Sequence, residues 1–340
     1  MTPKPSSEPL SCWVVSDGRA GMENQALGLA EAIGRRTALR IEAKRLAVGA
    51  PWRALPRALW SDPFARLSSD SARLDAPFPD LWIACGRLSV PFSIAVRKRS
   101  PRTFVVQTQA PRAPLVSFDL VVPPEHDGLH GPNVFPILGS PNRLTPSRLK
   151  DDARRLAPAL AHLPAPRVAV LVGGPNRAYR FSAHARQRFA DALRALADGG
   201  AGLMVTASRR TEDETRAAIL AALKEAPHFF WRGEAVAGLD NPYFGMLGLA
   251  DHVIVTADSV NMAAEAAMTG KPVHVFPLDR APLARRANKF ERFHRALAER
   301  GVARPFSGVL ESWRYEPLDE TSRAADETIR RLRAVGALKE

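Results

Sequence analysis

The sequence predicts an α/β protein built from two parallel sheets, one in each half of the chain. Apolar runs of strand length alternate with helical stretches, which is the pattern of βαβ units. These runs end in glycine-containing or polar turns, as strands do at the ligand-binding edge of an open parallel sheet. A chain of 340 residues has room for two such domains.

The first half follows a short lead, residues 1–10, that we expect to be disordered. Its expected strands are 11–16, 41–46, 81–85, 103–107 and 119–122. Helices are expected at about 23–35 and from Ser89 to about Arg99. We expect residues 11–145 to form the first domain and a linking helix to occupy residues 146–165.

The second half begins a new sheet with the apolar run 167–172. Its other expected strands are 202–206, 228–231, 252–256 and 273–276, with helices near 183–197, 208–214 onward, 243–249, 262–269, 286–300 and 319–335. We expect a second domain over 166–310 and a C-terminal helical segment, 311–340, that packs back on the first domain. The ligand edges of the two domains are expected to face each other across a cleft.

The clearest βαβ unit lies between Asn241 and Leu278. Its helix is stopped by Gly270-Lys271-Pro272, because glycine accepts a left-handed cap and proline cannot continue a helix. Ligands bind such a unit where the carboxyl end of its strand meets the amino end of its helix. That place is Thr256-Ala257-Asp258-Ser259-Val260-Asn261, and Glu265 is the first carboxylate within the helix. We infer that a nucleotide-linked ligand binds there.

Two further turns at the same expected edge are candidates for binding phosphate: Gly173-Gly174-Pro175-Asn176-Arg177 and Ser208-Arg209-Arg210-Thr211. The first turn offers the backbone N–H groups of a phosphate cradle. The second opens a helix with a serine cap, and arginines at a helix start indicate a nearby anion. A bare turn and a solvated surface are the respective alternatives.

The first expected strand ends in a second candidate ligand turn, Asp17-Gly18-Arg19-Ala20-Gly21. Its glycines allow a ligand to approach the backbone, and the next helix offers free N–H groups. The turn lacks the GxGxxG pattern, so dinucleotide binding is not indicated. The polar residues that accompany it at this edge are Asn24, Gln25, Gln107 and Gln109. The alternative is a plain tight turn.

A segment rich in aromatic residues and arginine, PWRALPRALWSDPFARL, occupies residues 51–67. Tryptophan at the headgroup level and arginine towards anionic lipid are typical of an interfacial membrane patch. The alternative is a helical excursion whose aromatic side chains pack inside the domain.

Composition limits the partners and the compartment. The net charge of +13 fits either solvated arginine-rich helices or attraction to an anionic surface or phosphorylated substrates. We expect no nucleic-acid partner, because no zinc finger, RNA-binding motif or compact basic helix is present.

Two cysteines, Cys12 and Cys85, indicate a reducing compartment. With no signal-peptide pattern or run of membrane-spanning length, we expect a cytoplasmic protein, with peripheral attachment to the inner face of the membrane as an alternative.

Two strand–loop–helix halves of this kind resemble the two Rossmann-like domains of B-type glycosyltransferases. The segment ADHVIVTADSVNMAAEAAMTGKPVHVFPL is similar to the donor-site motif of the N-acetylglucosaminyltransferase of peptidoglycan synthesis and of sugar-nucleotide epimerases. This resemblance implies that Ser259 and Asn261 lie at the diphosphate and that Glu265 holds the ribose. Ser259 stands where those relatives usually have glycine.

Several motifs follow one another along the chain: SDGRAGMENQALGLAEA, QTQAPR with FDLVVPPEHDG, VLVGGPNRAYRFS and TASRRTEDE. In this fixed order they resemble the Elm family, which comprises plant mitochondrial-fission proteins and bacterial relatives. The resemblance covers roughly residues 11–280. We also expect Tyr243 and Asp258 to belong to the nucleotide-sugar site. Plant members recruit division machinery to the mitochondrial surface, so the fold need not imply catalysis.

The leading functional hypothesis is metal-independent transfer of a sugar from a nucleotide-diphosphate sugar to a cell-envelope or lipid-linked acceptor. No cofactor and no metal are expected, because no Asp-x-Asp motif is present. Sugar transfer with inversion needs a base near the acceptor hydroxyl; Asp17 is the first candidate, and His126 with Asp127 is the second. The alternatives are a sugar-nucleotide 2-epimerase and a non-catalytic scaffold on a membrane surface.

Overall fold

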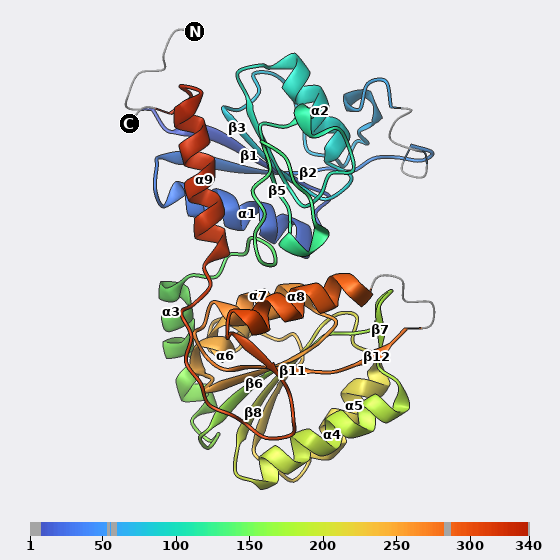
Figure 1. Cartoon of the computed structure of the whole chain (residues 1–340), viewed down its shortest axis with the longest axis vertical. Helices are drawn as coiled ribbons and strands as arrows, with labels where there is room; N and C mark the ends of the chain where they lie inside the picture. Colours follow the sequence, from blue (N-terminus) through green and yellow to red (C-terminus); the bar gives the residue numbers. More distant parts are fainter. Residues whose placement is uncertain (1–7, 53–54, 56–59, 282–286, 339–340) are drawn as a thin grey trace. The chain divides into compact units, whose positions relative to one another are not determined.

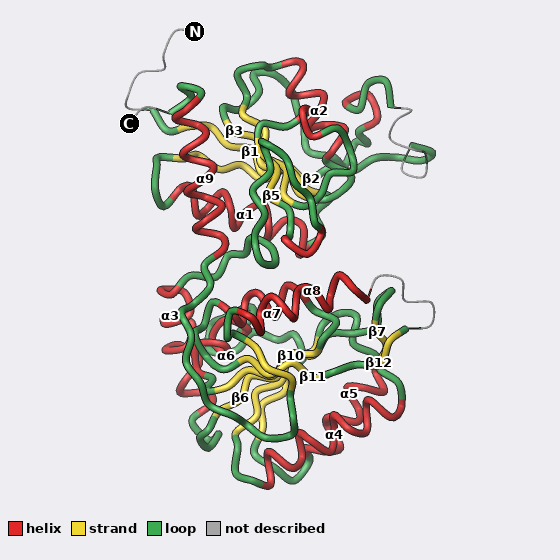
Figure 2. The backbone as a smooth tube through the Cα atoms, in the orientation of Figure 1, coloured by secondary structure: helices red, strands yellow, loops and turns green. Residues whose placement is uncertain are grey.

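The computed structural model describes residues 8–52, 55, 60–281 and 287–338 (Figure 1). The chain forms two compact units. The first unit runs to Arg143 and also includes the segment from Asp319 onward, and the second runs from Leu144 to Leu318. Each unit is an open parallel sheet with helices on both faces, as the backbone trace in Figure 2 shows.

The first unit contains a five-stranded sheet of order β2-β1-β3-β4-β5, in which all pairings are parallel. The strands are β1 (Leu10–Ser16), β2 (Leu39–Arg45), β3 (Leu81–Cys85), β4 (Phe104–Thr108) and β5 (Leu120–Val122). The helices are α1 (Ala20–Gly34), α2 (Val90–Arg99) and α9 (Glu320–Ala334), with 3-10 turns at Phe64–Arg66, Leu115–Ser117 and Glu125–Asp127. All five strands expected from the sequence are confirmed within two residues at each end.

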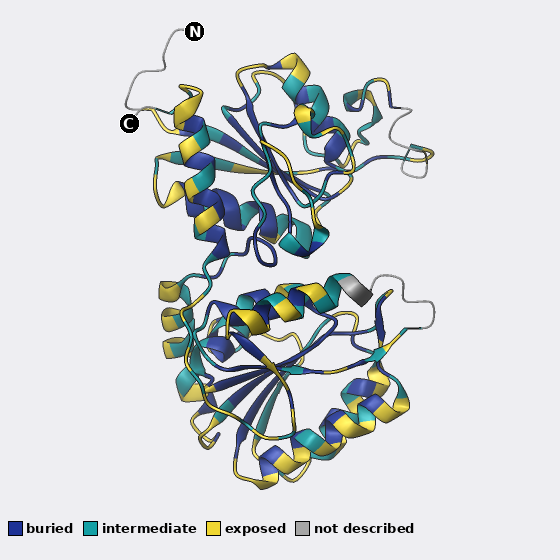
Figure 3. Cartoon of the chain, viewed as in Figure 1, coloured by how far each residue is buried: buried dark blue, intermediate teal, exposed yellow. Residues whose placement is uncertain are grey.

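Alternation along the strands divides the apolar residues of this sheet between its two faces. Cys12 and Val14 face a cluster with α1 and α9, whereas Val15 faces a cluster that includes Phe92 of α2. Figure 3 shows much of the sheet in the colour of buried residues, although the edge strand β2 is partly exposed. The hydrophobic effect of these two clusters therefore holds helices against both faces.

Helix α9 packs on one face of this sheet, although it lies near the C-terminal end of the chain. Asp319 caps it by accepting a hydrogen bond from Ser322 N at 2.9 Å. The buried Glu320 carboxylate accepts a hydrogen bond from Leu138 N at 2.8 Å, and the Thr321 hydroxyl accepts one from Asn142 N at 2.9 Å. The first turn of α9 is thus fixed to the segment that leaves the first unit.

The second unit contains a six-stranded parallel sheet of order β13-β11-β10-β6-β8-β9. Its strands are β6 (Arg167–Val172), β8 (Gly202–Ala207), β9 (His228–Trp231), β10 (His252–Thr256), β11 (Val273–Phe276) and β13 (Ala303–Pro305), and β7 (Tyr179–Arg180) pairs antiparallel with β12 (Asp279–Arg280). The helices are α3 (Pro146–Leu156), α4 (Ala183–Asp198), α5 (Asp213–Leu223), α6 (Tyr243–Leu249), α7 (Val260–Ala267) and α8 (Ala287–Glu299), with a 3-10 turn at Ala157–Leu160. The sequence did not predict β7, β12 or β13.

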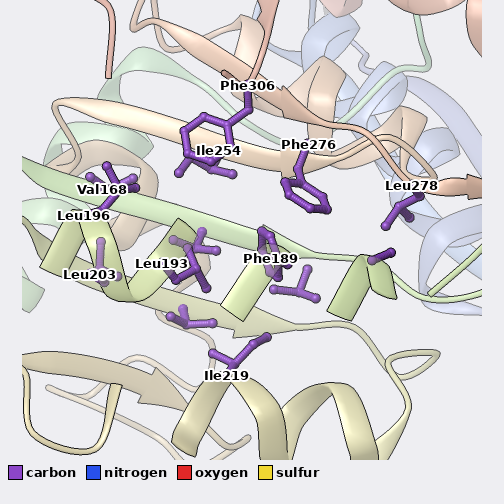
Figure 4. Close-up of a cluster of buried hydrophobic side chains, with 14 of the residues drawn as sticks. Val168, Phe189, Leu193, Leu196, Leu203, Ile219, Ile254, Phe276, Leu278 and Phe306 are labelled. Atoms are coloured by element: carbon purple, nitrogen blue, oxygen red, sulfur yellow. The ribbon is translucent and has the colours of Figure 1, made fainter. Parts of the chain in front are cut away.

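One hydrophobic cluster of the second unit lies between the sheet and helices α4 and α5 (Figure 4). Phe189 of α4 packs on Phe276 of β11 with a ring-centroid distance of 4.6 Å. Ile219 of α5 and Ile254 of β10 belong to the same cluster. These side chains fix the strands whose carboxyl ends carry the candidate site.

Helix α3, the expected linking helix, packs within the second unit against α6. Gly245 and Gly248 allow this close contact, since a Cβ at either glycine would lie within 3 Å of the α3 backbone. The α3 atoms concerned are the backbone carbonyl oxygen of Asp152, which lies closest to Gly245, and that of Leu149, which lies closest to Gly248.

The aromatic residues of the 51–67 segment that the structure describes pack inward. Trp60 is 6% exposed and contacts Phe92 edge-on, with ring centroids 6.3 Å apart. Phe64 packs on the same ring at 5.7 Å, and Trp52 is covered by the Arg66 guanidinium at 3.7 Å. This arrangement corresponds to internal packing, the alternative to a membrane patch; residues 53–54 and 56–59 lie outside the described part of the chain.

Candidate nucleotide-sugar site

Three loops meet at the carboxyl edge of the sheet in the second unit. They follow β6, β10 and β8, which are neighbours in the parallel sheet. The loops contain Gly173–Arg177, Ala257–Ser259 and Ser208–Thr211, the three turns singled out in the sequence. The tertiary structure thus brings these predicted residues together at one edge.

Asp258 is the residue that joins the three loops. Its side chain is buried, and its carboxylate accepts hydrogen bonds from Gly174 N at 2.9 Å and from the Thr256 hydroxyl at 2.6 Å. The Arg210 guanidinium donates to the same carboxylate at 3.1 Å. Burial raises the pKa of Asp258, while the bonds from Thr256, Gly174 and Arg210 oppose that rise. These bonds indicate that Asp258 holds the loops together.

Gly173 and Gly174 are required by this packing. A Cβ on Gly173 would lie 2.2 Å from an Asp258 carboxylate oxygen, and one on Gly174 would lie 2.1 Å from the Arg210 carbonyl oxygen. The buried Thr211 hydroxyl donates to the Gly173 carbonyl at 2.6 Å. This hydrogen bond fixes the β6 loop to the β8 loop. The glycines therefore permit close contact between protein loops, a structural role in addition to the predicted phosphate cradle.

The two adjacent arginines of the β8 loop differ in their surroundings. Arg210 is engaged with Asp258 and with the Gly174 carbonyl at 3.0 Å. Arg209 and Arg177 are exposed, and within the described ranges neither makes an ion pair or a side-chain hydrogen bond. Arg209 and Arg177 are thus the site arginines whose guanidinium groups are available to an anion.

Ser208 does not begin a helix, contrary to the prediction. Helix α5 starts at Asp213 with Glu212 at the N-cap position. The Ser208 hydroxyl instead accepts a hydrogen bond from Arg210 N at 3.2 Å within the loop. The loop is longer than expected because Thr211 turns inward to bond with the β6 loop.

Asn176 also acts within the protein. Its side-chain oxygen accepts hydrogen bonds from Ala178 N at 2.7 Å and Tyr179 N at 2.9 Å, and its amide donates to the Asp258 carbonyl at 3.2 Å. At the start of α7, the Ser259 hydroxyl accepts a hydrogen bond from Met262 N at 3.4 Å, and Asn261 is exposed. The amino end of α7 carries partial positive charge and adjoins the three loops.

Glu265 and Tyr243 form a hydrogen-bonded pair beside this edge. The Tyr243 hydroxyl donates to Glu265 Oε2 at 2.8 Å. Burial raises the pKa of Glu265 to about 7, although the bond from Tyr243 acts in the opposite direction. A carboxyl group of this pKa can accept or donate hydrogen bonds near neutral pH.

His294 of α8 was not predicted from the sequence. Its Nε2 lies 2.8 Å from the Ala257 carbonyl oxygen, which can only accept a hydrogen bond, so Nε2 carries the proton. Burial lowers the pKa of His294 and favours the neutral ring. Its spacing from Phe290 and Phe293 on the helix is the signal that could have placed it on the inward face, but no local signal links it to a loop 37 residues earlier.

The first unit has a cavity of about 810 Å³ at the carboxyl edge of its own sheet. Asp17, Arg19 and Gln109 line it, as expected for the candidate ligand turn. Asp17 accepts a hydrogen bond from Arg19 N at 3.2 Å and forms an ion pair with the Arg19 guanidinium at 3.0 Å. Gly18, which has a φ of 74°, forms the left-handed turn between them.

Other residues predicted at this edge have different surroundings. Gln107 is buried and accepts a hydrogen bond from Ser93 at 3.2 Å, while Gln25 is buried beneath Gln109. Gly21 and Asn24 lie in α1, and Asn24 is exposed. His126 is buried in the turn after β5, where its Nε2 lies 3.9 Å from Asp127 Oδ1. Neither residue is among the described residues that line the cavity. Of the described candidates for the catalytic base, only Asp17 is therefore among the residues that line the cavity.

Residues 20–332 match the protein family described as Mitochondrial fission ELM1. The chain belongs to this family. The Mitochondrial fission protein ELM1 of Arabidopsis thaliana is 32% identical over 286 residues, which cover 76% of this chain and 65% of that protein. An uncharacterized protein of Rickettsia prowazekii, RP120, is 26% identical and covers 93% of this chain and 97% of its own length.

The ELM1-family chain also has the fold predicted for it. The UDP-GlcNAc 2-epimerase of Methanocaldococcus jannaschii superposes with a TM-score of 0.54 at 9% identity, covering 96% of this chain and all of that one. Two Rossmann-like domains of the glycosyltransferase B architecture are thereby confirmed. At this level of identity the likeness concerns the fold alone.

Two structural features are absent from the described residues of the ELM1-family chain. Within the described ranges, no group of three or more His, Cys, Asp or Glu side chains is arranged to hold a metal ion. Among the same residues, no helix has both the length and the apolar character needed to span a membrane.

Proposed function

We propose that this ELM1-family protein transfers a sugar from a nucleotide-diphosphate sugar to a cell-envelope or lipid-linked acceptor, without a metal ion. The observation that carries the proposal is the carboxyl edge of the second sheet. There the exposed Arg177 and Arg209, the amino end of α7 and the Glu265–Tyr243 pair adjoin three loops held by Asp258. Edges of this kind bind nucleotides in open α/β sheets.

The donor diphosphate would be held by Arg177 and Arg209 and by the N–H groups of α7. Arginine binds phosphate through several N–H groups in a fixed plane. The same groups would stabilise the negative charge that develops on the departing diphosphate. Glu265 would accept hydrogen bonds from the ribose hydroxyls, as the sequence resemblance implies.

The transfer step would use Asp17 as the base. The acceptor hydroxyl oxygen forms a bond to the anomeric carbon while the bond from that carbon to the diphosphate oxygen breaks. The hydroxyl proton passes to the Asp17 carboxylate, and the nucleoside diphosphate leaves with the bonding electron pair. Asp17 lines a cavity large enough for a small-molecule acceptor.

The first experiment measures binding of UDP-, GDP-, ADP- and CMP-sugars to the full chain by calorimetry. We expect one nucleotide class to bind, and Arg209→Gln to weaken that binding about tenfold through loss of a charged hydrogen bond. Arg194→Gln, on the exposed surface of α4, serves as the matched control and should bind normally. Absence of binding by all four classes at millimolar concentration would contradict the proposal and favour a non-catalytic scaffold.

Arg210 provides a second comparison with its neighbour. Arg210→Gln removes the Asp258 partner, so we expect it to lower the free energy of unfolding by about 1–3 kcal/mol as well as nucleotide affinity. Arg209→Gln should leave the unfolding free energy unchanged, because its side chain has no described partner. Equal effects of the two variants on stability would contradict this division of roles.

Catalysis is tested separately with Asp17→Asn. This variant keeps an oxygen that can accept the Arg19 N–H bond but cannot take a proton. We expect donor binding to persist and sugar transfer to be lost. Conversion of a UDP-sugar to its 2-epimer in the absence of an acceptor would instead identify the epimerase alternative.

A further inference from the structure

The cavity in the first unit is assembled from segments that follow four different strands of the sheet. The polar and charged side chains that line it are Asp17, Arg19, Ser68, Asp70, Arg87 and Gln109. The volume of about 810 Å³ lies within the range of small-molecule sites. Of these residues, only Asp17, Arg19 and Gln109 are predicted from the sequence to lie at the ligand edge.

Gln109 has an unusual conformation at the wall of this cavity. Its φ of 75° lies in the left-handed region, which residues other than glycine seldom adopt. Its backbone N–H donates to the Val122 carbonyl at 3.0 Å, so the bond to β5 holds this conformation. Backbone of this kind is concentrated at ligand sites, where the surrounding structure fixes it.

The Gln109 side chain is also oriented by its neighbours. Its Nε2 donates to the Gln25 side-chain oxygen at 3.0 Å, and the buried Cys85 thiol approaches the same oxygen at 3.4 Å. Since Gln25 uses its oxygen as the common acceptor, the Gln109 amide nitrogen is directed towards α1. The side-chain amide oxygen of Gln109, Oε1, is then the atom of that amide that remains to accept a hydrogen bond from a ligand.

The charges around the cavity are balanced. Asp17 neutralises Arg19 through their ion pair at 3.0 Å. Asp70 is exposed at the cavity and accepts a hydrogen bond from the Ser68 hydroxyl at 2.5 Å, a bond that lowers the pKa of its carboxyl. Two carboxylates therefore line the cavity together with two guanidinium groups, those of Arg19 and Arg87.

This lining contrasts with the edge of the second unit. There the exposed side chains Arg177 and Arg209 are both cationic, and neither has an ion-pair partner within the described ranges. The balanced charges of the first unit's cavity give a phosphate no net attraction, whereas a sugar hydroxyl can donate to a carboxylate or amide oxygen and accept from a guanidinium group. The apolar residues Met22, Leu46, Val48 and Leu88 can cover the C–H faces of a sugar ring.

We propose that the cavity of the first unit binds a neutral, hydroxyl-rich ligand, the sugar end of an acceptor. Asp70 and the Gln109 side-chain amide oxygen accept hydrogen bonds from its hydroxyl groups. Sugar binding at this cavity stands on the lining alone, whereas the role of that sugar as acceptor rests on the proposed transferase function.

The test uses saturation-transfer NMR on the full chain with two neutral disaccharides, cellobiose and N,N′-diacetylchitobiose. We expect at least one to receive saturation, and Asp70→Ala to weaken its binding about tenfold, because a hydrogen bond to a charged group is lost. Asp75→Ala removes an exposed carboxylate that is not among the lining residues and should have no effect. Gln109→Asn should also weaken binding, since asparagine tolerates the left-handed backbone but has a shorter side chain.

Three results would overturn the assignment: no saturation of either disaccharide at millimolar concentration, binding unaffected by Asp70→Ala and Gln109→Asn, or tighter Asp70-dependent binding of glucose 6-phosphate. Glu265→Gln separates this site from the proposed donor site, because it should leave disaccharide binding unchanged while weakening nucleotide binding. If the protein binds a disaccharide but no nucleotide, the assignment of sugar binding to the cavity would stand and the proposed transferase function would be contradicted.

Discussion

The Tyr243 hydroxyl donates a hydrogen bond to Glu265 Oε2 over 2.8 Å and thereby connects α6 to α7. Helix α6 precedes β10 in the chain and α7 follows it. The bond therefore connects the helix that leads into the βαβ unit with the crossover helix of that unit. Burial of the pair raises the pKa of Glu265 to about 7 and that of Tyr243 well above its usual value. Near neutral pH the Glu265 carboxyl group is therefore close to half protonated.

Glu265 should make folding stability depend on pH. Its pKa rises from 4.5 in the unfolded chain to about 7 in the folded protein, so the folded state binds the extra proton. The resulting stability is fully present below about pH 4.5 and is lost as pH rises to about 7, up to a total of about 3 kcal/mol. Glu265→Gln should remove this component, as measured by denaturant unfolding across that range.

Glu299→Gln is the control for this measurement. Glu299 is an exposed carboxylate on α8, and its substitution should leave the slope of stability against pH unchanged. An identical slope in Glu265→Gln and the parent protein would show that Glu265 does not bind the extra proton.

Removal of the Tyr243 hydroxyl should raise the Glu265 pKa further. The hydroxyl stabilises the ionised carboxylate, so Tyr243→Phe favours the protonated form. We expect the upper end of the pH-dependent range to move to higher pH, and NMR titration of the Glu265 carboxyl carbon to report the shift directly. A lower pKa in Tyr243→Phe would contradict this account of the pair.

Gly173→Ala should destabilise the second unit. The added methyl group would lie 2.2 Å from the buried Asp258 carboxylate, so the three loops must separate. We expect a loss of about 1–3 kcal/mol, the usual range for overpacking, measured by chemical denaturation. Gly34→Ala is the matched control, because its Cβ would meet side-chain atoms only at 3.7 Å or beyond. If both variants unfold at the same denaturant concentration, the close packing of Gly173 on Asp258 is not required.

Trp60→Ala should lower the stability of the first unit by about 3–5 kcal/mol, because the buried ring leaves a cavity against Phe92. Trp52→Ala should cost less, because that ring is only partly buried beneath Arg66. Thermal or denaturant unfolding checks both values. A Trp60 variant with unchanged stability and reduced co-sedimentation with anionic liposomes would instead support the membrane patch.

Much of the fold could be predicted because apolar runs and turn residues act locally. The strands β1, β6 and β10 are continuous apolar segments that end in polar turns, and this pattern located the two sheet edges. Gly270, expected to follow the end of α7, has a φ of 69°. In contrast, β7 and β12 are two-residue strands with no periodic signal, and they form only because they pair with each other.

The sequence by itself determined which turns carry polar and glycine residues at the edge of each sheet. Only the tertiary structure decided the role of each side chain. It committed Arg210 to the buried Asp258 and left its neighbour Arg209 exposed, and it brought Ser68 and Asp70 to the cavity beside Asp17. The physical reason is that periodicity depends on neighbours in the chain, whereas burial, pKa and hydrogen bonding depend on residues that only folding brings together.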